Sequence, residues 1–350
     1  MPSLTTTRTR RCPSCGKTFP ATADYFYQIP SNGRLLRCTV NGCHSAYYRA
    51  RRAAQASGSR VTRSRRGTGQ RYGVEIEFTG ASREAVARAL QGAGIRCSAE
   101  SYNHSTRSYW KVIADASVSG GGELVSPPLR GAEGLAEIET VCRALHSIGV
   151  TVNNTCGLHV HHDMSGHTPE TFGRAFRLWM NNQAHIDRLV ARGRRAGASQ
   201  WCRPLTEREV AHITDVATIS GIDRRRASFR VDRYKALNVT SFSKYGTVEI
   251  RQHQGATNAR KINAWIQFGQ AIFAYAKAST NTAAFADVNT MLDALVADAG
   301  LSADTAAYLK DRAVALGSHQ PTTVVQTVDV DGERLDAEGR CPQMFAASVR

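Results

Sequence analysis

The sequence predicts an α+β protein. Its 350 residues, 42% of them hydrophobic, are ample for a well-buried core. From residue 71 onward, strand patterns and helix patterns alternate without a βαβ rhythm of fixed length, and no internal repeat is visible. A short cysteine-rich segment precedes them. We therefore expect a small N-terminal module followed by a larger mixed domain.

Positive charge is concentrated at the N-terminus. Residues 1–71 hold fourteen Arg and Lys side chains and one acidic side chain, Asp24, which gives +13 of the net charge of +16. By subtraction, the remainder carries 31 basic and 28 acidic side chains and is close to balanced. Any surface that binds a polyanion is therefore expected in the N-terminal region and not along the whole chain.

The sequence also predicts the compartment. No stretch approaches the roughly 18 apolar residues that span a bilayer, and the start lacks the apolar core of a signal peptide. Nine cysteines are an odd number, and five of them are scattered along the chain. This usage fits a reducing compartment better than a disulfide framework. We expect a soluble cytoplasmic protein with no membrane partner.

The N-terminal module contains two close cysteine pairs. Cys12 and Cys15 are followed, after 22 residues, by Cys38 and Cys43, which is the spacing that four tetrahedral thiolate ligands of one Zn²⁺ require. Because all four positions are filled, such a zinc is structural and folds a module too small for its own core. His44 in place of Cys43, or four unrelated buried cysteines, are the alternative interpretations.

A basic stretch follows the cysteines. Tyr47 and Tyr48 adjoin Arg49, Arg51 and Arg52. Cations beside aromatic rings suit phosphate contact and base stacking, so nucleic acid is one expected partner and a protein is the other. A solvated basic helix is an equally good interpretation. Serine and glycine then indicate a linker.

The mixed domain opens with a strand over 72–78, where apolar and polar residues alternate. Ser82 then caps an alanine-rich helix that runs to about Gly92. Strands are expected at 109–114 and 123–126, because both runs are apolar and a proline pair ends the second. A helix over 133–147 follows.

The second half repeats these signals. Strands are expected at 157–162 and 247–251, and Thr168 followed by proline marks the start of a helix. Asn258 opens a longer helix to residue 278, and two more helices fill about 288–316. The stretch from 193 to 232 is polar and unassigned, apart from a possible helix at 206–213, and one strand is possible at 323–328. The parts predicted are a four-cysteine zinc-ribbon-like module (8–46), a basic helix and linker (47–70), a catalytic domain (71–280), a helical extension (281–318) and a polar tail (319–350).

Three of the expected strands carry polar, metal-capable side chains on one face. Residues two apart in a strand share a face. One such pair is typical of a solvated surface strand. The metal-site hypothesis therefore depends on the recurrence of such pairs in three strands. The pairs, in chain order, are Glu75 with Glu77, His159 with His161, and Glu249 with Arg251.

If these faces meet on one sheet, Glu75, Glu77, Glu249 and Glu123 converge. Carboxylates this close cannot all stay ionised without a cation between them. Oxygen ligands with imidazole at the margin select Mg²⁺ or Mn²⁺ over zinc. Arg251 would neutralise developing phosphate charge. The sequence therefore predicts a metal-dependent enzyme that acts with a phosphate compound.

Five motifs resemble the amidoligase family and occur in that family's order. They are Tyr-Gly-Val-Glu-Ile-Glu-Phe at 72–78, Gly-Glu-Leu-Val-Ser-Pro at 122–127, Cys-Gly-Leu-His-Val-His at 156–161, Arg-Tyr-Lys-Ala-Leu-Asn at 233–238 and Thr-Val-Glu-Ile-Arg-Gln-His-Gln-Gly at 247–255. The family is related to glutamine synthetase and glutamate-cysteine ligase, and many members occur in phages and bacteria. The resemblance covers roughly residues 72–278 and implies a mostly antiparallel sheet of the glutamine-synthetase type.

The resemblance implies an ATP-dependent carboxylate-amine ligase, in which ATP phosphorylates a carboxylate and an amine displaces phosphate to give an amide. ATP and Mg²⁺ or Mn²⁺ are the implied cofactors, and the acyl substrate is either a small molecule or a macromolecule. The residues it implies are Glu75, Glu77, Glu123 and Glu249 as metal ligands, His159 and His161 near metal or nucleotide phosphate, and Arg251 on phosphate. Tyr234 and Asn238 shape the pocket, and Asn238 is also expected to bind the cofactor. Asp115 and Ser117 stand where the family has an Asp-Gly-Ser turn, with Ala116 between them here.

Other interpretations stay open. Cys156 with His159 would suit a cysteine hydrolase, although proximity in sequence says little about geometry. The run from His159 to Asp163 would suit a zinc hydrolase, but it lacks a HExxH pattern and leaves the glutamates without a role. A nucleic-acid-binding protein with an inactive body is a further alternative. Three glycines at 120–122 are expected to form a flexible loop, and approach to a phosphate is the alternative.

Overall fold

The structure is a computed structural model. It describes residues 9–12, 17–21, 26–28, 35–38, 69–118, 120–215, 217–218, 221–222, 232–317, 327–328 and 334–335. The chain divides into two compact units, residues 1–65 and 66–350. No described helix combines the length and the apolar character needed to cross a membrane.

Two short antiparallel hairpins form the described part of the N-terminal unit. They pair β1 (Thr9–Arg11) with β2 (Thr18–Pro20) and β3 (Phe26–Gln28) with β4 (Leu35–Cys38). The first hairpin closes at Cys12, whose backbone N–H donates to the Lys17 carbonyl at 2.8 Å. Phe19 and Phe26 meet edge to face, with 6.3 Å between ring centroids. This ring contact brings β2 and β3 together within the described part of the unit.

The predicted zinc site falls largely outside the described residues. Cys12 is buried, Cys38 ends β4 without a described side chain, and Cys15 and Cys43 are not described. The predicted basic helix and linker also lie outside the described part. The zinc site therefore stays a prediction.

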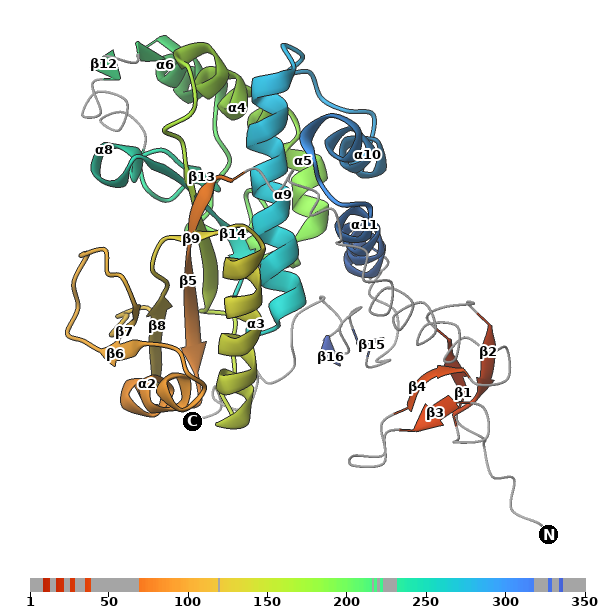
Figure 1. The fold of residues 1–350 in the computed structure, drawn as a ribbon. Helices are drawn as coiled ribbons and strands as arrows, with labels where there is room; N and C mark the ends of the chain where they lie inside the picture. Colours follow the sequence, from red (N-terminus) through yellow and green to blue (C-terminus); the bar gives the residue numbers. More distant parts are fainter. Residues whose placement is uncertain are drawn as a thin grey trace, which may run out of the picture. The chain divides into compact units, whose positions relative to one another are not determined.

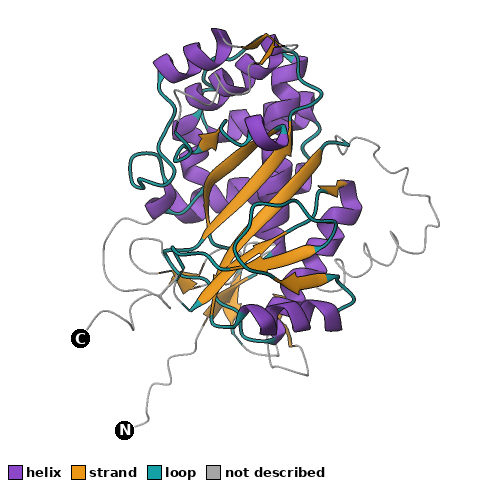
Figure 2. Ribbon diagram, turned by 90° about the vertical axis from the view of Figure 1, so that its left-hand side faces the viewer, coloured by secondary structure: helices purple, strands orange, loops and turns teal. Residues whose placement is uncertain are grey.

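An eight-stranded sheet lies at the centre of the larger unit (Figures 1 and 2). Its strands follow the order β13-β14-β10-β5-β8-β7-β6, and β9 pairs with β5. Every pair is antiparallel except β6 with β7. The strands are β5 (Arg71–Thr79), β6 (Cys97–Ala99), β7 (Trp110–Ile113), β8 (Gly121–Val125), β9 (Leu129–Arg130), β10 (Gly157–Asp163), β13 (Leu237–Asn238) and β14 (Thr247–Gln254). The α+β fold with a mostly antiparallel sheet is confirmed.

Helices α3 (Gly131–Ser147) and α9 (Ala259–Ala278) lie against the apolar face of this sheet (Figure 1). Small residues let them come close. A Cβ atom added at Gly134 would lie 2.5 Å from the hydroxyl of Tyr72, and one at Gly269 would lie 2.4 Å from His162 Nε2. The opposite face of the sheet is left for polar side chains.

The remaining elements complete this unit. They are α2 (Arg83–Gly92), α4 (Pro169–Asn181), α5 (Gln183–Ile186), the 3₁₀ helices η1 (Asp187–Leu189) and η2 (Arg192–Arg194), α6 (Glu207–Asp215), α8 (Phe242–Tyr245), α10 (Val288–Ala299), α11 (Ala303–Gly317), and the strand pairs β11 (Ala217–Thr218) with β12 (Gly221–Ile222) and β15 (Thr327–Val328) with β16 (Arg334–Leu335). The predicted helix starts are confirmed, since the side chains of Ser82, Thr168 and Asn258 each accept a hydrogen bond from a backbone N–H in the first turn.

The expectation of a flexible glycine loop at 120–122 is wrong. Gly121 and Gly122 belong to β8. A Cβ atom at Gly121 would lie 1.8 Å from the Phe78 carbonyl oxygen of β5. These glycines therefore allow close approach of backbone to backbone beside the site, and they are not a mobile segment.

Candidate active site

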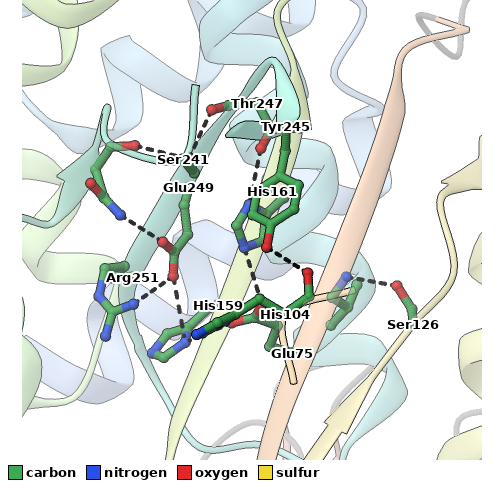
Figure 3. Close-up of polar contacts among 12 residues, drawn as sticks. Glu75, His104, Ser126, His159, His161, Ser241, Tyr245, Thr247, Glu249 and Arg251 are labelled. Carbon is green, nitrogen blue, oxygen red and sulfur yellow. Dashed lines mark hydrogen bonds and ion pairs between the residues drawn. The ribbon is translucent and has the colours of Figure 1, made fainter. Parts of the chain in front are cut away.

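The polar faces of the predicted strands meet on one sheet. Strands β14, β10, β5 and β8 are consecutive neighbours, so residues far apart in the sequence become cross-strand partners. The facing pairs are Asn238 with Glu249, Glu249 with His161, His159 with Glu75, and Glu77 with Glu123. Figure 3 shows the side chains of Glu75, His159, His161 and Glu249 pointing towards one another from the sheet.

His159 occupies the centre of the cluster and is 4% exposed. Its Nδ1 atom lies 3.3 Å from Glu75 Oε2 and 3.6 Å from Glu249 Oε1. Its Nε2 atom lies 3.7 Å from Glu77 Oε1. One imidazole thus contacts three carboxylates, although the sequence pattern placed imidazole at the margin of the site.

His161 is held in one orientation. Its Nε2 atom lies 3.2 Å from Glu75 Oε1, and its Nδ1 atom lies 3.1 Å from the Thr247 hydroxyl. The Tyr245 ring meets the imidazole edge to face, with 6.2 Å between centroids. Burial lowers the pKa of His161, but Glu75 and Glu249 outweigh burial and raise it.

Glu249 is fixed from two sides. Arg251 Nη1 donates to Glu249 Oε1 at 2.6 Å, and Asn238 Nδ2 donates to Glu249 Oε2 at 2.7 Å. Asn238 is itself held, because its side-chain oxygen accepts the Thr240 N–H at 2.8 Å. Asn238 therefore orients a carboxylate of the cluster, and its predicted contact with nucleotide stays a prediction.

Glu77 is 5% exposed and accepts a hydrogen bond from the backbone N–H of Gly157 at 2.6 Å. Glycine is required there, since a Cβ atom at Gly157 would lie 2.8 Å from His159 Nε2. The backbone donor and the His159 ring together fix the position of the Glu77 side chain.

The carboxylates differ in how easily they ionise. Burial and the neighbouring charges of Glu75 and Glu77 raise the pKa of Glu123 well above its usual value. Burial also acts to raise the pKa of Glu75, but His161 and His159 outweigh it and hold that pKa well below the usual value. Arg251 and His161 likewise lower the pKa of Glu249 against the effect of burial. Among these three carboxyl groups, Glu123 is therefore the one whose ionised form the neighbouring charges disfavour.

Two groups of side chains suit a divalent cation. Ligand atoms of Glu75, His159 and Glu249 lie within 4.8 Å of one another, and so do those of Glu77, Glu123 and His159. Both groups are rich in carboxylate oxygen and share one imidazole, which fits Mg²⁺ or Mn²⁺ better than a thiolate-preferring metal. A bound cation would also offset the burial and the charge repulsion that disfavour the ionised form of Glu123. The donor set therefore fits the predicted metal.

Arg194 is a site residue that the sequence did not reveal. It comes from η2, in the polar stretch that has no clear periodicity. Its Nη2 atom donates to the Arg251 carbonyl at 2.6 Å, and its buried Nε–H has no hydrogen-bond partner among the described residues. Arg251 Nε is also buried without a partner in the described part of the chain. Two guanidinium groups with unused donors thus flank the carboxylates, which is the chemistry that binds an anion.

A cavity of about 680 Å³ lies over the cluster. Glu75, Glu123 and Glu249 line its floor. The loop of residues 101–108, between β6 and β7, lines one wall together with α8. A space of this size accommodates a small-molecule substrate or a side chain with its flanking residues.

The buried side chain of Lys111 holds the 101–108 loop. Its Nζ atom donates to the Asn103 carbonyl at 2.9 Å, to Asn103 Oδ1 at 3.0 Å and to the Ser105 carbonyl at 2.9 Å. Because three donors of one ammonium meet three oxygens, the loop has a defined shape above the floor of the cavity.

The Asp115 to Ser117 turn forms despite the alanine at its centre. Asp115 Oδ1 accepts the Ser117 N–H at 2.7 Å and the Ser117 hydroxyl at 2.6 Å. Asp115 lines the cavity. The side chain of Asp115 closes this turn, so a glycine in the middle position is not needed.

Neither hydrolase interpretation is supported by the geometry. Cys156 is buried, which raises the pKa of its thiol to about 11, and its sulfur lies 3.5 Å from Asn153 Oδ1. His162 points to the other face of β10, against Phe273, with 5.2 Å between ring centroids. Asp163 pairs with Arg71 at 2.9 Å. The neighbouring sequence positions therefore do not assemble one catalytic group.

Comparisons with known proteins identify one family. A family model described as "Putative amidoligase enzyme" matches residues 68–273, more than half of the chain. No functionally curated protein matches. Among solved structures, a bifunctional glutathione synthetase from Pasteurella multocida is similar at 11% sequence identity and a TM-score of 0.35, with 71% of this chain and 47% of that chain covered. This chain thus spans about half the length of that protein.

Proposed function

The chain belongs to the family of putative amidoligase enzymes, and on that premise we propose that it is an ATP-dependent ligase that joins a carboxylate to an amine. The observation that carries this proposal is the contact of His159 with Glu75, Glu77 and Glu249, beside Arg251. Carboxylates that face one another from an antiparallel sheet also support the glutamine-synthetase type of catalytic fold.

The proposed reaction has two steps. A carboxylate oxygen of the acyl substrate attacks the γ-phosphorus of ATP, the bond from that phosphorus to its bridging oxygen breaks, and ADP leaves. The amine nitrogen then attacks the acyl carbon, the bond from that carbon to the phosphate oxygen breaks, and the nitrogen loses a proton. The products are the amide, ADP, phosphate and a proton, and the first step makes the carboxylate carbon reactive.

The residues of the cluster fit roles in this reaction. The groups around His159 would hold Mg²⁺ or Mn²⁺, which neutralises phosphate charge when bound. Glu249 holds Arg251 in place, so the remaining N–H groups of Arg251 are ready to donate to phosphoryl oxygens. Arg194 supplies a second guanidinium beside it. These contacts support a position for the transferred phosphoryl group over the carboxylate cluster.

ADP release tests the proposal. The full-length protein is incubated with Mg²⁺-ATP, panels of carboxylates and amines, and a coupled assay for ADP. A carboxylate labelled with ¹⁸O is expected to pass one ¹⁸O atom to the released phosphate, because its oxygen bridges carbon and phosphorus in the intermediate. Amide formation without ATP, or phosphate without the label, contradicts the mechanism.

For the N-terminal unit we propose a structural zinc held by Cys12, Cys15, Cys38 and Cys43. The cysteine spacing and the tight turn that closes at Cys12 support it. The unit's charge suits nucleic acid or an acidic protein as partner. Metal analysis is expected to give one zinc per chain, and gel shifts across a salt series are expected to show a steep loss of nucleic-acid affinity. A zinc content that is unchanged in a Cys12→Ser, Cys15→Ser variant contradicts the site.

A further inference from the structure

Two exposed aromatic side chains line the cavity, and two more form a pair next to Arg233, which also lines it. The exposed large apolar side chains of the described residues are Val314 and four aromatics: Tyr102, Trp201, Tyr234 and Tyr245. Tyr102 and Tyr245 line the cavity, and Trp201 meets Tyr234 edge to face with 5.1 Å between centroids. Such clustering on one side of a molecule is typical of a binding surface.

Two cations that pair with no acidic side chain of the described residues accompany these rings. Arg233 and Lys244 line the cavity and are both exposed. Arg233 lies 5.7 Å from the centroid of the Tyr234 ring, and Lys244 lies 5.0 Å from that of Tyr245. Within the described residues, neither forms an ion pair, whereas Arg107 at the same rim is paired with Glu100. The rim thus holds positive charge that is free to meet a ligand.

The loop and α8 join across this rim at His104. The Tyr245 hydroxyl donates to the His104 carbonyl at 2.7 Å, and the Tyr102 hydroxyl lies 3.0 Å from His104 Nε2. Partial burial and the nearby charges of Lys244 and Arg233 lower the pKa of His104. Both cations thus act on the same side chain of the rim, and an anion bound there would meet both of them.

We propose that this rim, Tyr102, His104, Trp201, Arg233, Tyr234, Lys244 and Tyr245, binds an acidic peptide segment that supplies the carboxylate to be activated. The inference rests on the proposed ligase function. Carboxylates of the segment would meet Arg233 and Lys244, and its backbone and side-chain methylenes would lie on the rings. One further carboxylate would reach the floor of the cavity. Nucleic acid would also satisfy cations and rings, but it brings no carboxylate to the carboxylate cluster.

The tryptophans of the chain provide a local signal. Trp110, Trp179 and Trp265 are buried, at 1% exposure or less, whereas Trp201 is 47% exposed. Acrylamide is neutral and quenches exposed tryptophan, so its effect on the full-length protein reports mainly on Trp201. A bound segment on the rim is expected to shield this side chain. Trp201→Phe removes the signal and verifies its origin.

The experiment titrates an eight-residue glutamate peptide into the full-length protein without ATP and follows acrylamide quenching. Saturable shielding is expected, and the Arg233→Gln, Lys244→Gln variant is expected to raise the apparent Kd about twenty-fivefold, at about fivefold for each exposed charge. Arg88→Gln, Arg143→Gln removes two exposed helix cations away from the cavity and is expected to change Kd less than about twofold. The basic N-terminal unit is identical in all variants and cancels from the comparison.

Three results would overturn the inference. They are equal shielding of Trp201 by a glutamine peptide of the same length, wild-type affinity in the double variant, and better shielding by a single-stranded oligonucleotide of equal charge than by the peptide. The last result would assign the rim to nucleic acid. If the glutamate peptide binds as expected but no amine gives ADP release, the rim stands and the ligase proposal fails. If other carboxylates give ADP release and the glutamate peptide does not bind, the ligase proposal stands and the rim proposal fails.

Discussion

Removing one carboxylate of the cluster should stabilise the metal-free protein. In Glu123→Gln, an amide of nearly the same shape replaces the carboxyl group whose pKa burial and the charges of Glu75 and Glu77 raise. A carboxyl whose pKa is raised on folding makes a contribution to stability that is fully present below its ordinary pKa and is lost as pH rises through the folded pKa. The gain in folding stability from Glu123→Gln is therefore absent at acidic pH and appears towards neutral and alkaline pH.

The size of the effect follows from the proton that Glu123 can take up. At pH 7.5 the cost of keeping this group charged is limited to about 4 kcal/mol, because a larger cost would protonate it instead. Solvent reaches part of the side chain, so we halve this limit and expect a gain of about 2 kcal/mol. For a domain of this size that corresponds to a rise of about 4 °C in Tm.

Thermal denaturation in EDTA, from pH 4 to pH 8, measures the gain. Addition of Mn²⁺ should reverse the order, because wild type gains up to about 3 kcal/mol at a hundredfold excess over Kd and the variant loses a ligand. Glu139→Gln, an exposed glutamate of α3, is the matched control and should shift Tm by less than about 1 °C, on the order of an ordinary surface change. A variant that is less stable than wild type at pH 8 in EDTA would refute the electrostatic reasoning.

Three further substitutions test other parts of the structure. Lys111→Met leaves three oxygens of the 101–108 loop without their donor, so it should lower the free energy of unfolding in urea by about 2 kcal/mol. It should also expose the loop to limited proteolysis, and an uncleaved loop would contradict this. Arg194→Gln should lower kcat about a hundredfold at saturating ATP, with partial recovery in Arg194→Lys, and an unchanged kcat would remove Arg194 from the site. Gly121→Ala forces a methyl group against a carbonyl oxygen of β5 and should lower stability by about 3 kcal/mol, whereas Gly92→Ala, with nothing within 4 Å, should not.

The sequence was informative where a pattern repeats over several residues. Alternation over 72–78 predicts the strand that carries Glu75 and Glu77, and side-chain caps predict the helix starts. The strands with His159 and Glu249 follow from the same period. Their convergence could be stated only as a condition, since strand order and register are set by contacts far along the chain.

Other features had no local signal. Strands β6 and β13 have three and two residues, too few for a periodic pattern. Arg194 lies in a polar stretch and becomes a site residue only through its contact with the Arg251 carbonyl. The rim is similar, because Arg233 and Lys244 look like ordinary surface charges until the fold places both at one cavity. Long-range packing decides these positions, and composition does not.

Nucleotide binding tests the central claim most directly, because it needs no knowledge of the acyl or amine substrate. Calorimetry of the full-length protein with a non-hydrolysable ATP analogue is expected to give saturable binding in Mg²⁺ or Mn²⁺ and at least about tenfold weaker binding in EDTA. Glu249→Gln should lose most of the metal-dependent part. Equal affinity with and without metal, or no binding in the presence of metal, would contradict the claim that the carboxylate cluster binds ATP through a divalent cation.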